Sequence, residues 1–294
     1  MDGIIIFYKP KGITSHGAVS FFRKLLNIKR IGHTGTLDPN AEGVLPICIG
    51  KATRVSEYLL TEDKEYRGIL TLGKSTDTQD GDGKTLESSS KVVSDEDIRR
   101  SFNKFKGNIS QTPPMYSALK HKGKKLYELA REGKTIERDA RDINIYELNI
   151  EEIYENKEIT FYTKCSRGTY IRTLCNDIGE DLGTFGYMSN LLRVGVGPFN
   201  IEDSYKIEDL EGLSPIEIEK LILPIDFALM KFKSIKIEDE LYKKLINGVN
   251  IQIYNKEYSL GDVLRVYSKN QFIGIGEIIE KNHLQLLKMN KVFV

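Results

Sequence analysis

The residue whose type and setting most suggest chemistry is Asp38, an aspartate in a glycine-containing loop. Gly32 and Gly35 precede it and Pro39 follows it. Glycines let a backbone take positive φ angles and approach a ligand closely, while a proline biases the residue before it away from helix. A carboxylate on such a loop suits nucleophilic or acid–base work. A simpler interpretation is that Asp38 only caps or ends a turn.

Two further segments contain side chains that could assist a carboxylate. In the run CSRGTYIR, which ends at Arg172, Gly168 and Thr169 predict a turn into a helix whose free N–H groups favour anions. Arg172 could pair with a buried carboxylate and keep it ionised, although an arginine at a helix start is more often a surface residue. Tyr66, in the run KEY, lies on a predicted strand and fits either a core position or a base-stacking platform.

The sequence signatures of several other chemistries are incomplete. The phosphate-binding pattern GxxxxGK[ST] fails because Lys51 is followed by Ala52. The dinucleotide pattern GxGxxG fails as well, because no strand leads into that spacing. His33 and Asp38 have no further metal ligands nearby, so we expect no metal site. Asp38 and Glu42 could in principle form the paired carboxylates of a glycosidase, and the sequence leaves that alternative open.

The composition places these residues in a globular chain. It has 294 residues, 40% of them hydrophobic and 29% charged, and 43 Lys+Arg against 42 Asp+Glu give a net charge of +1. Its apolar runs are far shorter than the ~18 residues that span a membrane, and no secretory signal is apparent. Three cysteines without CxxC spacing support neither a disulfide framework nor a structural zinc site. We therefore expect a cytoplasmic protein.

Nucleic-acid binding by a near-neutral chain would have to come from local basic patches. One basic patch lies within the first thirty residues, and a second contains Lys120, Lys122, Lys124 and Lys125. On charge alone, either patch is more often a solvated face than a binding site.

The hydrophobic pattern predicts the elements that must position these residues. A buried strand is expected over Ile4–Tyr8, followed by a helix that Thr14 or Ser15 caps. The other expected elements are a strand over Lys64–Gly73, a helix that begins at a capping box of Ser94 and Asp97, a hairpin of Ile143–Ile153 with Glu158–Ser166, and a helix over Tyr170–Leu182.

The pattern changes after Phe227. A short helix is expected over Glu238–Gly248, and strands over Val263–Tyr267, Phe272–Ile279 and Leu284–Met289. These elements make a β-rich module of about 65 residues, close to the lower end for a domain that folds alone. The sequence therefore predicts a mixed α/β body with a small β-rich tail.

Taken together and in order, these segments resemble the bacterial TruB-type tRNA pseudouridine synthases. The resemblance extends from the N-terminus to about residue 195, and GHTGTLDP is its most specific part. A less distinct resemblance links the tail to the small RNA-binding PUA module. The matching runs are GIIIFYKPKG (3–12), GHTGTLDPNAEG (32–43), KEYR (64–67), LGKSTDTQD (72–80), PMYSALKHKGKKLY (114–127), RDAR (138–141), SRGTYIRT (166–173) and Leu191–Arg193.

The resemblance implies a fold and an activity. The fold is of the α/β (α+β) class: a mixed-sheet catalytic domain over residues 1–228, with a thumb-like insert at about 114–141, and a PUA-like domain over residues 229–294. The activity is the isomerisation of uridine 55 in the T loop of tRNA. The glycosidic C–N bond is cleaved, the uracil turns over, and a C–C bond forms to the same ribose. No cofactor or metal is implied.

The resemblance also assigns residues. Asp38 is the nucleophile, Arg172 pairs with it, and Tyr66 stacks on the flipped uracil near C5 for the final deprotonation. Whether Asp38 acts first at base C6 or at the ribose stays open. The implied substrate-binding residues are His33 in the vacated stack, Asp80 on the flipped nucleotides, Tyr170 and Leu191 around the uracil, Lys9 beside the site, and Lys120, Lys122, Lys124 and Lys125 on RNA phosphates.

The expected partner is tRNA, bound through its T arm, with no membrane and no obligatory protein partner. The chain is expected to be a monomer. Other hypotheses are a non-catalytic tRNA-folding or RNA-binding factor, a guide- or partner-dependent pseudouridine synthase, and a base-hydrolysing glycosylase. The presence of Asp38, Tyr66 and Arg172 together favours an enzyme, and the thumb-like insert favours direct recognition of tRNA.

Overall fold

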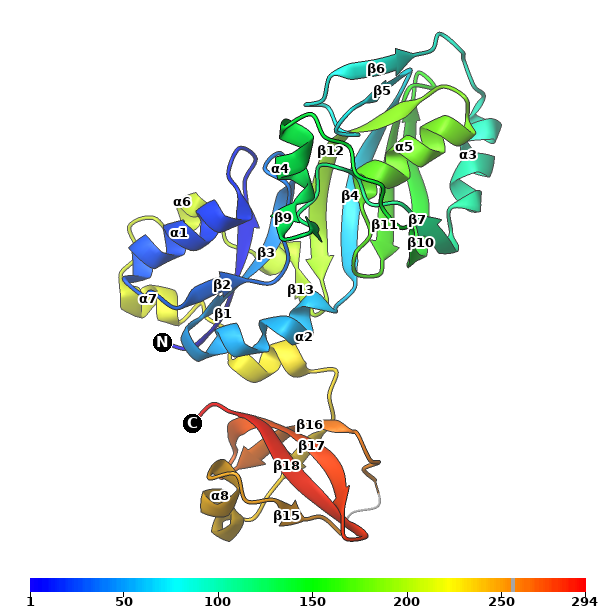
Figure 1. The fold of residues 1–294 in the computed structure, drawn as a ribbon. Coiled ribbons are helices and arrows are strands. Elements are labelled where there is room, and N and C mark those ends of the chain that lie inside the picture. Colours follow the sequence, from blue (N-terminus) through cyan, green and yellow to red (C-terminus); the bar gives the residue numbers. More distant parts are fainter. Residues whose placement is uncertain (255–256) are drawn as a thin grey trace.

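The chain folds around a large mixed β-sheet, and a smaller sheet follows it near the C-terminus (Figure 1). The computed structural model describes residues 1–254 and 257–294. The path through the large sheet is β1-β3-β12-β4-β11-β10-β7, with β2 paired to β3 and β13 paired to β12. Its strands are β1 (Gly3–Lys9), β2 (Ile31–His33), β3 (Glu42–Ile49), β4 (Lys64–Leu72), β7 (Gly107–Gln111), β10 (Arg141–Tyr154), β11 (Glu158–Cys165), β12 (Gly186–Val196) and β13 (Phe199–Asn200).

Two of the helices begin where the sequence predicts. The Thr14 side chain accepts a hydrogen bond from the Gly17 N–H at 2.9 Å and caps α1 (Ser15–Leu26). Ser94 and Asp97 form the capping box of α3 (Asp95–Lys104). The other helices are α2 (Ser56–Leu60), α4 (Leu126–Arg131), α5 (Ile171–Asp181), α6 (Ile207–Leu210), α7 (Pro215–Glu219) and α8 (Asp239–Ile246), with short 3₁₀ turns η1 (Gly50–Val55), η2 (Ile201–Asp203) and η3 (Ile225–Leu229).

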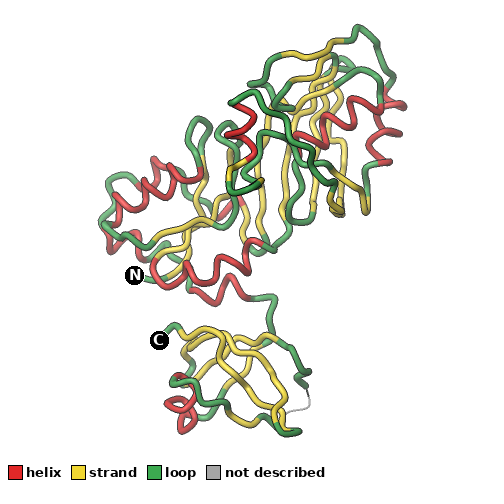
Figure 2. The backbone as a smooth tube through the Cα atoms, in the orientation of Figure 1, coloured by secondary structure: helices red, strands yellow, loops and turns green. Residues whose placement is uncertain are grey.

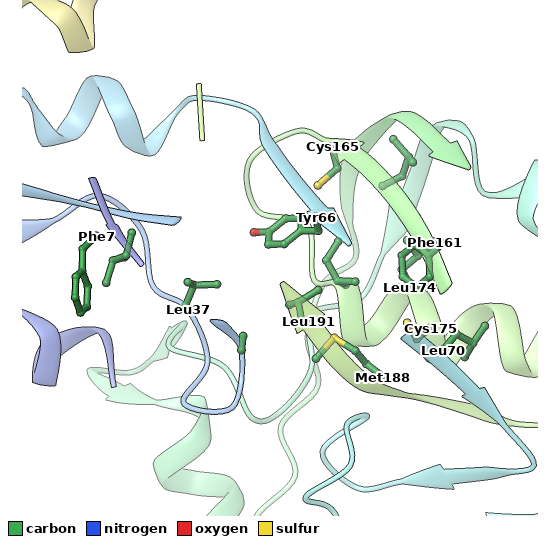
Figure 3. Packing of buried hydrophobic residues seen from close by; sticks show 14 of the residues in the cluster. Phe7, Leu37, Tyr66, Leu70, Phe161, Cys165, Leu174, Cys175, Met188 and Leu191 are labelled. Atoms are coloured by element: carbon green, nitrogen blue, oxygen red, sulfur yellow. The ribbon is translucent and has the colours of Figure 1, made fainter. Parts of the chain in front are cut away.

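Apolar side chains from β4, β11, α3 and α5 make one continuous core on the helix-covered face of the sheet. The rings of Phe102 in α3 and Phe161 in β11 meet edge to face, with centroids 5.8 Å apart. Figure 3 shows this packing, with Phe161, Leu174 and Leu70 gathered on one side of Tyr66. The burial of this core fixes β4 and α5 relative to each other.

A short parallel contact joins the two halves of the large sheet. β3 pairs with β12 only through Glu42 with Leu192 and Gly43 with Arg193, whereas its pairing with β1 is antiparallel along the whole strand. Gly43 has a φ of +106°, and a Cβ there would lie 2.2 Å from the Arg193 carbonyl oxygen. Only glycine fits this position, which explains the last glycine of the run GHTGTLDPNAEG.

The predicted hairpin is confirmed, as β10 and β11 pair antiparallel across a turn in which Glu155 and Asn156 have positive φ angles. Two small hairpins extend from the body: β5 (Lys74–Thr76) pairs with β6 (Thr85–Ser88), and β8 (Lys120–His121) pairs with β9 (Lys124–Lys125). No helix in the described ranges is both long enough and apolar enough to cross a membrane.

The C-terminal module contains the predicted strands and the predicted helix α8. Its sheet has the order β14-β16-β17-β18-β15, formed by β14 (Ser234–Lys236), β15 (Ile251–Gln252), β16 (Val263–Ser268), β17 (Gln271–Lys281) and β18 (Leu284–Val292). A loop connects this module to η3 in the body (Figure 2). Ile275 and Phe293 of the module share one apolar cluster with Ile4 and Phe199 of the body, so the two parts pack directly on each other.

Candidate active site

Asp38, Arg172 and Asp80 meet although they come from three distant segments. Arg172 lies in the first turn of α5, Asp38 in the loop between β2 and β3, and Asp80 in the loop after β5. The Arg172 guanidinium lies 2.9 Å from Asp38 Oδ2 through one nitrogen and 3.6 Å from Asp80 Oδ2 through another. The Arg172 side chain is 7% exposed and that of Asp38 is 39% exposed. The site therefore presents an accessible carboxylate held by a buried cation.

The loop that carries Asp38 is held on both sides of that residue. Lys9 is fully buried, and its ammonium donates to the carbonyls of Pro10, Ile13 and Pro39 at 2.8–3.1 Å. Before Asp38, the Ser15 hydroxyl accepts from the Leu37 N–H at 2.8 Å and lies 3.1 Å from the Leu37 carbonyl. Burial lowers the pKa of Lys9 to about 8. These contacts give Lys9 a role in shaping the loop.

Asp80 is fixed by its own loop before it meets Arg172. Its Oδ1 accepts from the Thr78 hydroxyl at 2.5 Å and from the Asp82 N–H at 3.1 Å. Burial raises the pKa of Asp80. Asn40 donates to the Asp82 carboxylate, which links this loop to the Asp38 loop. The predicted proximity of Asp80 to the other site residues is therefore present in the fold.

Tyr66 and Leu191 lie on facing strands beside this ion pair. Tyr66 in β4 is opposite Arg193 in β12, and Leu191 is opposite Gly68, so all four side-chain positions face the same side of the sheet. Tyr66 is 9% exposed and Leu191 is 7% exposed. Burial raises the pKa of the Tyr66 phenol to about 12. In Figure 3 its hydroxyl points toward the side on which Leu37 lies, away from Leu70 and Phe161.

Tyr170 and His33 lie at the edges of the site. Tyr170 precedes α5, and its backbone N–H and carbonyl both bond to the Gln111 amide, at 2.8 and 3.1 Å. Its ring centroid lies 6.0 Å from the Arg172 guanidinium carbon, and burial raises the pKa of its phenol. His33 ends β2, and its Nδ1 accepts from the Gly35 N–H at 3.3 Å. Burial lowers the pKa of His33, which favours the neutral imidazole.

The predicted phosphate-binding lysines lie on the β8–β9 hairpin, which α4 follows in the chain. Lys120, Lys122 and Lys124 are exposed, while Lys125 is half-buried, with its ammonium 5.4 Å from the Tyr127 ring centroid. Lys124 lies 3.5 Å from the Glu132 carboxylate. In Figure 1 this hairpin and α4 are drawn in front of strands β3 and β12.

Arg193 is a site residue that the sequence assignments left out. It is 1% exposed and lies directly opposite Tyr66 on the neighbouring strand, where its positive charge lowers the pKa of the Tyr66 phenol against the effect of burial. The only signal in the sequence was its place in the same matching run as Leu191. The sequence around Arg193 does not indicate that its side chain is buried, because that burial arises only when β12 lies between β3 and β4.

Two alternative site types gain no support from the geometry. Glu42 accepts from the Tyr8 hydroxyl at 3.0 Å and lies 3.8 Å from the Lys11 ammonium, so its carboxylate has partners other than Asp38. Within residues 1–254 and 257–294, no group of three or more His, Cys, Asp or Glu is arranged to hold a metal ion.

Comparison with known proteins places the chain in a family. Residues 23–171 match the N-terminal domain of the TruB family pseudouridylate synthases. Residues 172–230 match the tRNA pseudouridylate synthase B C-terminal domain, and residues 234–285 the C-terminal domain of pseudouridine synthase II TruB. The fold and these family matches thus define a pseudouridine synthase. The chain belongs to the TruB family.

Individual relatives agree with this assignment along the whole chain. A tRNA pseudouridine synthase B of Alkaliphilus oremlandii is 46% identical over 97% of this chain and 96% of its own length. One of Clostridioides difficile is 43% identical over the full length of both chains. Among solved structures, one of a Cbf5-Nop10-Gar1 complex has 28% identity and a TM-score of 0.76, covering 99% of this chain and 85% of the other.

Proposed function

We propose that this enzyme isomerises uridine 55 in the T loop of tRNA to pseudouridine, with Asp38 as the nucleophile. The observation that carries the assignment of Asp38 is its accessible carboxylate, 2.9 Å from the buried guanidinium of Arg172. The relatives named tRNA pseudouridine synthase B support tRNA as the substrate. Because the reaction is an isomerisation, its atoms and electrons balance without a redox partner.

Arg172 acts on Asp38 through charge and through orientation. A guanidinium at hydrogen-bonding distance favours the anionic carboxylate, which is the nucleophilic form. The Asp80 carboxylate on the other side of Arg172 limits how far the guanidinium can turn. Asp38 is thereby presented as an anion in one orientation, ready to attack C6 of the uracil or to act at the ribose.

The uracil must leave the T-loop stack to reach Asp38, at a cost of roughly a few kcal/mol. Tyr66, Leu191 and Tyr170 provide an apolar and aromatic lining for the flipped base, and the Tyr66 oxygen is the group proposed to take the C5 proton. His33, neutral at physiological pH because of its burial, would fill the vacated place in the stack.

RNA binding away from the flipped uridine is assigned to the thumb-like insert at 114–141 and to the C-terminal module from residue 229 onward. The exposed lysines of the β8–β9 hairpin would contact phosphates, and such contacts fix register without reading sequence. The enzyme is proposed to act as a monomer in the cytoplasm without a protein partner. Its free cysteines, Cys48, Cys165 and Cys175, fit a reducing compartment.

The test uses an unmodified tRNA transcript tritiated at uridine C5, with purified protein alone. Tritium release is expected, because C5 loses its hydrogen when it bonds to the ribose. Release should stop with Asp38→Asn or with a replaced T-loop uridine, while Asp38→Asn still binds tRNA. Asp203→Asn, a change of an exposed aspartate in η2, should leave release unchanged.

Each alternative gives a different result in this assay. Tight binding without release would favour a tRNA-folding factor. Release that begins only after a guide or protein is added would favour the partner-dependent hypothesis, which the structural similarity to a Cbf5-Nop10-Gar1 complex motivates. Free uracil among the products would indicate a glycosylase. Full release by Asp38→Asn would remove Asp38 as the nucleophile.

A further inference from the structure

Arg193 is a buried cation whose contacts are not those of an ordinary ion pair. It is the largest of the fully buried side chains, and no described carboxylate lies within ion-pairing distance of it. A buried charge costs several kcal/mol unless hydrogen bonds compensate it. The hydrogen bonds of Arg193 therefore indicate which parts of the site it holds together.

Its hydrogen-bond partners are two backbone carbonyls on either side of Asp38, and its cross-strand neighbour is Tyr66. Nε donates to the Val44 carbonyl at 2.7 Å, and Nη2 donates to the Gly35 carbonyl at 3.3 Å. Arg193 is also the direct cross-strand neighbour of Tyr66, and its positive charge lowers the pKa of the Tyr66 phenol against the effect of burial. Gly35 and Val44 lie on either side of Asp38 in the chain. Arg193 therefore joins the loop of the nucleophile to the strand of the tyrosine.

The backbone keeps this guanidinium in one place. Arg193 pairs with Tyr66 on one neighbouring strand and with Gly43 on the other. The close approach at Gly43 leaves no room for a side chain between β3 and β12. Since the backbone of Arg193 is paired on both sides, its two donated hydrogen bonds hold the guanidinium beside Tyr66 in a defined place.

We propose that Arg193 is a positioning residue for the last step of the isomerisation: it aims the Tyr66 oxygen at C5 of the uracil and stabilises negative charge on that oxygen. This inference rests on the proposed function and adds to it a residue that acts through Tyr66. Burial works against a charged phenol oxygen, and the guanidinium is the neighbour that opposes this effect most strongly.

The step balances in atoms and electrons. After C5 has bonded to the ribose, its C–H bond breaks, the proton passes to the Tyr66 oxygen, and the electron pair completes the C5=C6 double bond. Tyr66 accepts the proton as a phenolate, or as a phenol that releases its own proton to solvent in the same event. N1 of the ring gains a proton in exchange, so the sum is an isomerisation.

The experiment measures the hydrogen isotope effect at C5, comparing tRNA that carries protium or deuterium there. Arg193→Met and Arg193→Lys should lower turnover at least about tenfold, because proton-transfer groups contribute ~10²–10⁴. They should also raise the isotope effect above the wild-type value, because C5 deprotonation becomes slow. In a Tyr66→Phe background, adding Arg193→Met should lower turnover by no more than about twofold further, since both changes impair the same proton transfer.

A matched control removes another buried cation near the site. Lys64 is 8% exposed and donates to the Leu60 carbonyl at 3.0 Å and to the Glu62 carbonyl, both of which precede β4 in the chain. Lys64→Met should keep the wild-type isotope effect even if it lowers the melting temperature. Thermal unfolding of every variant separates loss of fold from loss of the proton step.

Several results would overturn the proposal. One is an unchanged isotope effect in a folded Arg193 variant. Another is a double variant whose turnover is lowered by the product of the two single effects of Arg193→Met and Tyr66→Phe. If neither Arg193 variant folds, Tyr66→Phe alone decides, because a wild-type isotope effect there excludes Tyr66 as the proton acceptor. Failure of the wild-type enzyme to form pseudouridine would instead contradict the proposed function.

Discussion

Arg172 places one guanidinium between two carboxylates, and the distances to them are unequal. The Asp38 contact at 2.9 Å is a charge-assisted hydrogen bond, whereas the Asp80 contact at 3.6 Å is an ion pair beyond good hydrogen-bonding distance. A lysine has a single ammonium and cannot reproduce the planar, two-sided geometry. The residue scale is therefore where the chemistry is most sensitive to substitution.

Arg172→Lys should reduce turnover by roughly 100-fold, which corresponds to about 3 kcal/mol of lost transition-state stabilisation. Tritium release from C5-labelled tRNA measures it, with a filter-binding assay as the control for RNA affinity. We expect the affinity to change far less than turnover, because Arg172 is buried beneath Asp38. Wild-type turnover in this variant would show that Asp38 needs no guanidinium.

The burial of Lys9 should make the free energy of unfolding depend on pH. Its pKa is lowered from 10.5 to about 8 in the folded protein, mainly by burial. Between those pH values the unfolded chain binds a proton that the folded chain has released, so Lys9 makes the free energy of unfolding rise with pH in that window. Below pH 8 both states are protonated and the contribution does not change.

Lys9→Met removes this titration. The difference in free energy of unfolding, wild type minus variant, should stay constant below about pH 8 and increase from pH 8 toward 10.5. Urea unfolding at a series of pH values measures it, and the titration of other groups cancels in the difference. A difference that falls over this range would contradict the burial of a charged lysine at this position.

At the scale of elements, the β8–β9 hairpin concentrates positive charge. Changing both Lys124→Glu and Lys125→Glu should weaken tRNA binding most at low salt and flatten its salt dependence, because phosphate contacts release counterions. The control is Arg99→Glu with Lys106→Glu, which makes the same charge change at exposed positions in and beside α3. Equal losses in the two double variants would point to bulk charge and remove the hairpin from RNA binding.

The elements with local signals could be predicted from the sequence. The caps at Thr14 and Ser94 depend on residues three positions apart, so they read directly from the chain. The antiparallel strands of the C-terminal module are separated by turns with positive φ, at Asn270 and Asn282, that the residue types favour.

The strand β12 and the role of Arg193 could not be predicted in the same way. β12 pairs with β3 and β4 across long sequence separations: Arg193 is 150 positions from Gly43 and 127 from Tyr66. Its polar residues also hide the strand pattern. The family resemblance was needed to assign the three proposed catalytic residues. From the residues alone, Asp38 could end a turn, Tyr66 could be a core residue and Arg172 could lie on the surface.

At the scale of the whole molecule, the C-terminal module is attached by side chains as well as by its linker. The Arg54 guanidinium donates to the Val292 carbonyl at 2.6 Å and lies 5.1 Å from the centroid of the Phe293 ring. Lys51 donates to the Phe293 carbonyl at 2.9 Å. Since Phe293 belongs to the cluster shared with the body, we expect the module and the body to unfold together.

Phe293→Ala should destabilise the protein by about 3 kcal/mol or more, the usual cost of removing a buried aromatic ring. Urea unfolding followed by circular dichroism and by tyrosine fluorescence measures it. We expect the two probes to coincide in the wild type and to separate in the variant, where the module unfolds first. Tyr254→Ala, an exposed aromatic change in the same module, is the control and should have little effect.

Because the contacts of the site join residues far apart in the sequence, activity can arise only late in the synthesis and folding of the chain. Arg193 bonds to Val44 across 149 positions and to Gly35 across 158. A ribosome adding ~5–20 residues per second needs roughly 7–30 s to make that stretch. During that time Asp38 has been synthesised but Arg193 has not, so the nascent chain carries an unassembled site. Refolding should accordingly restore tritium release with its slowest phase, after the helices have formed.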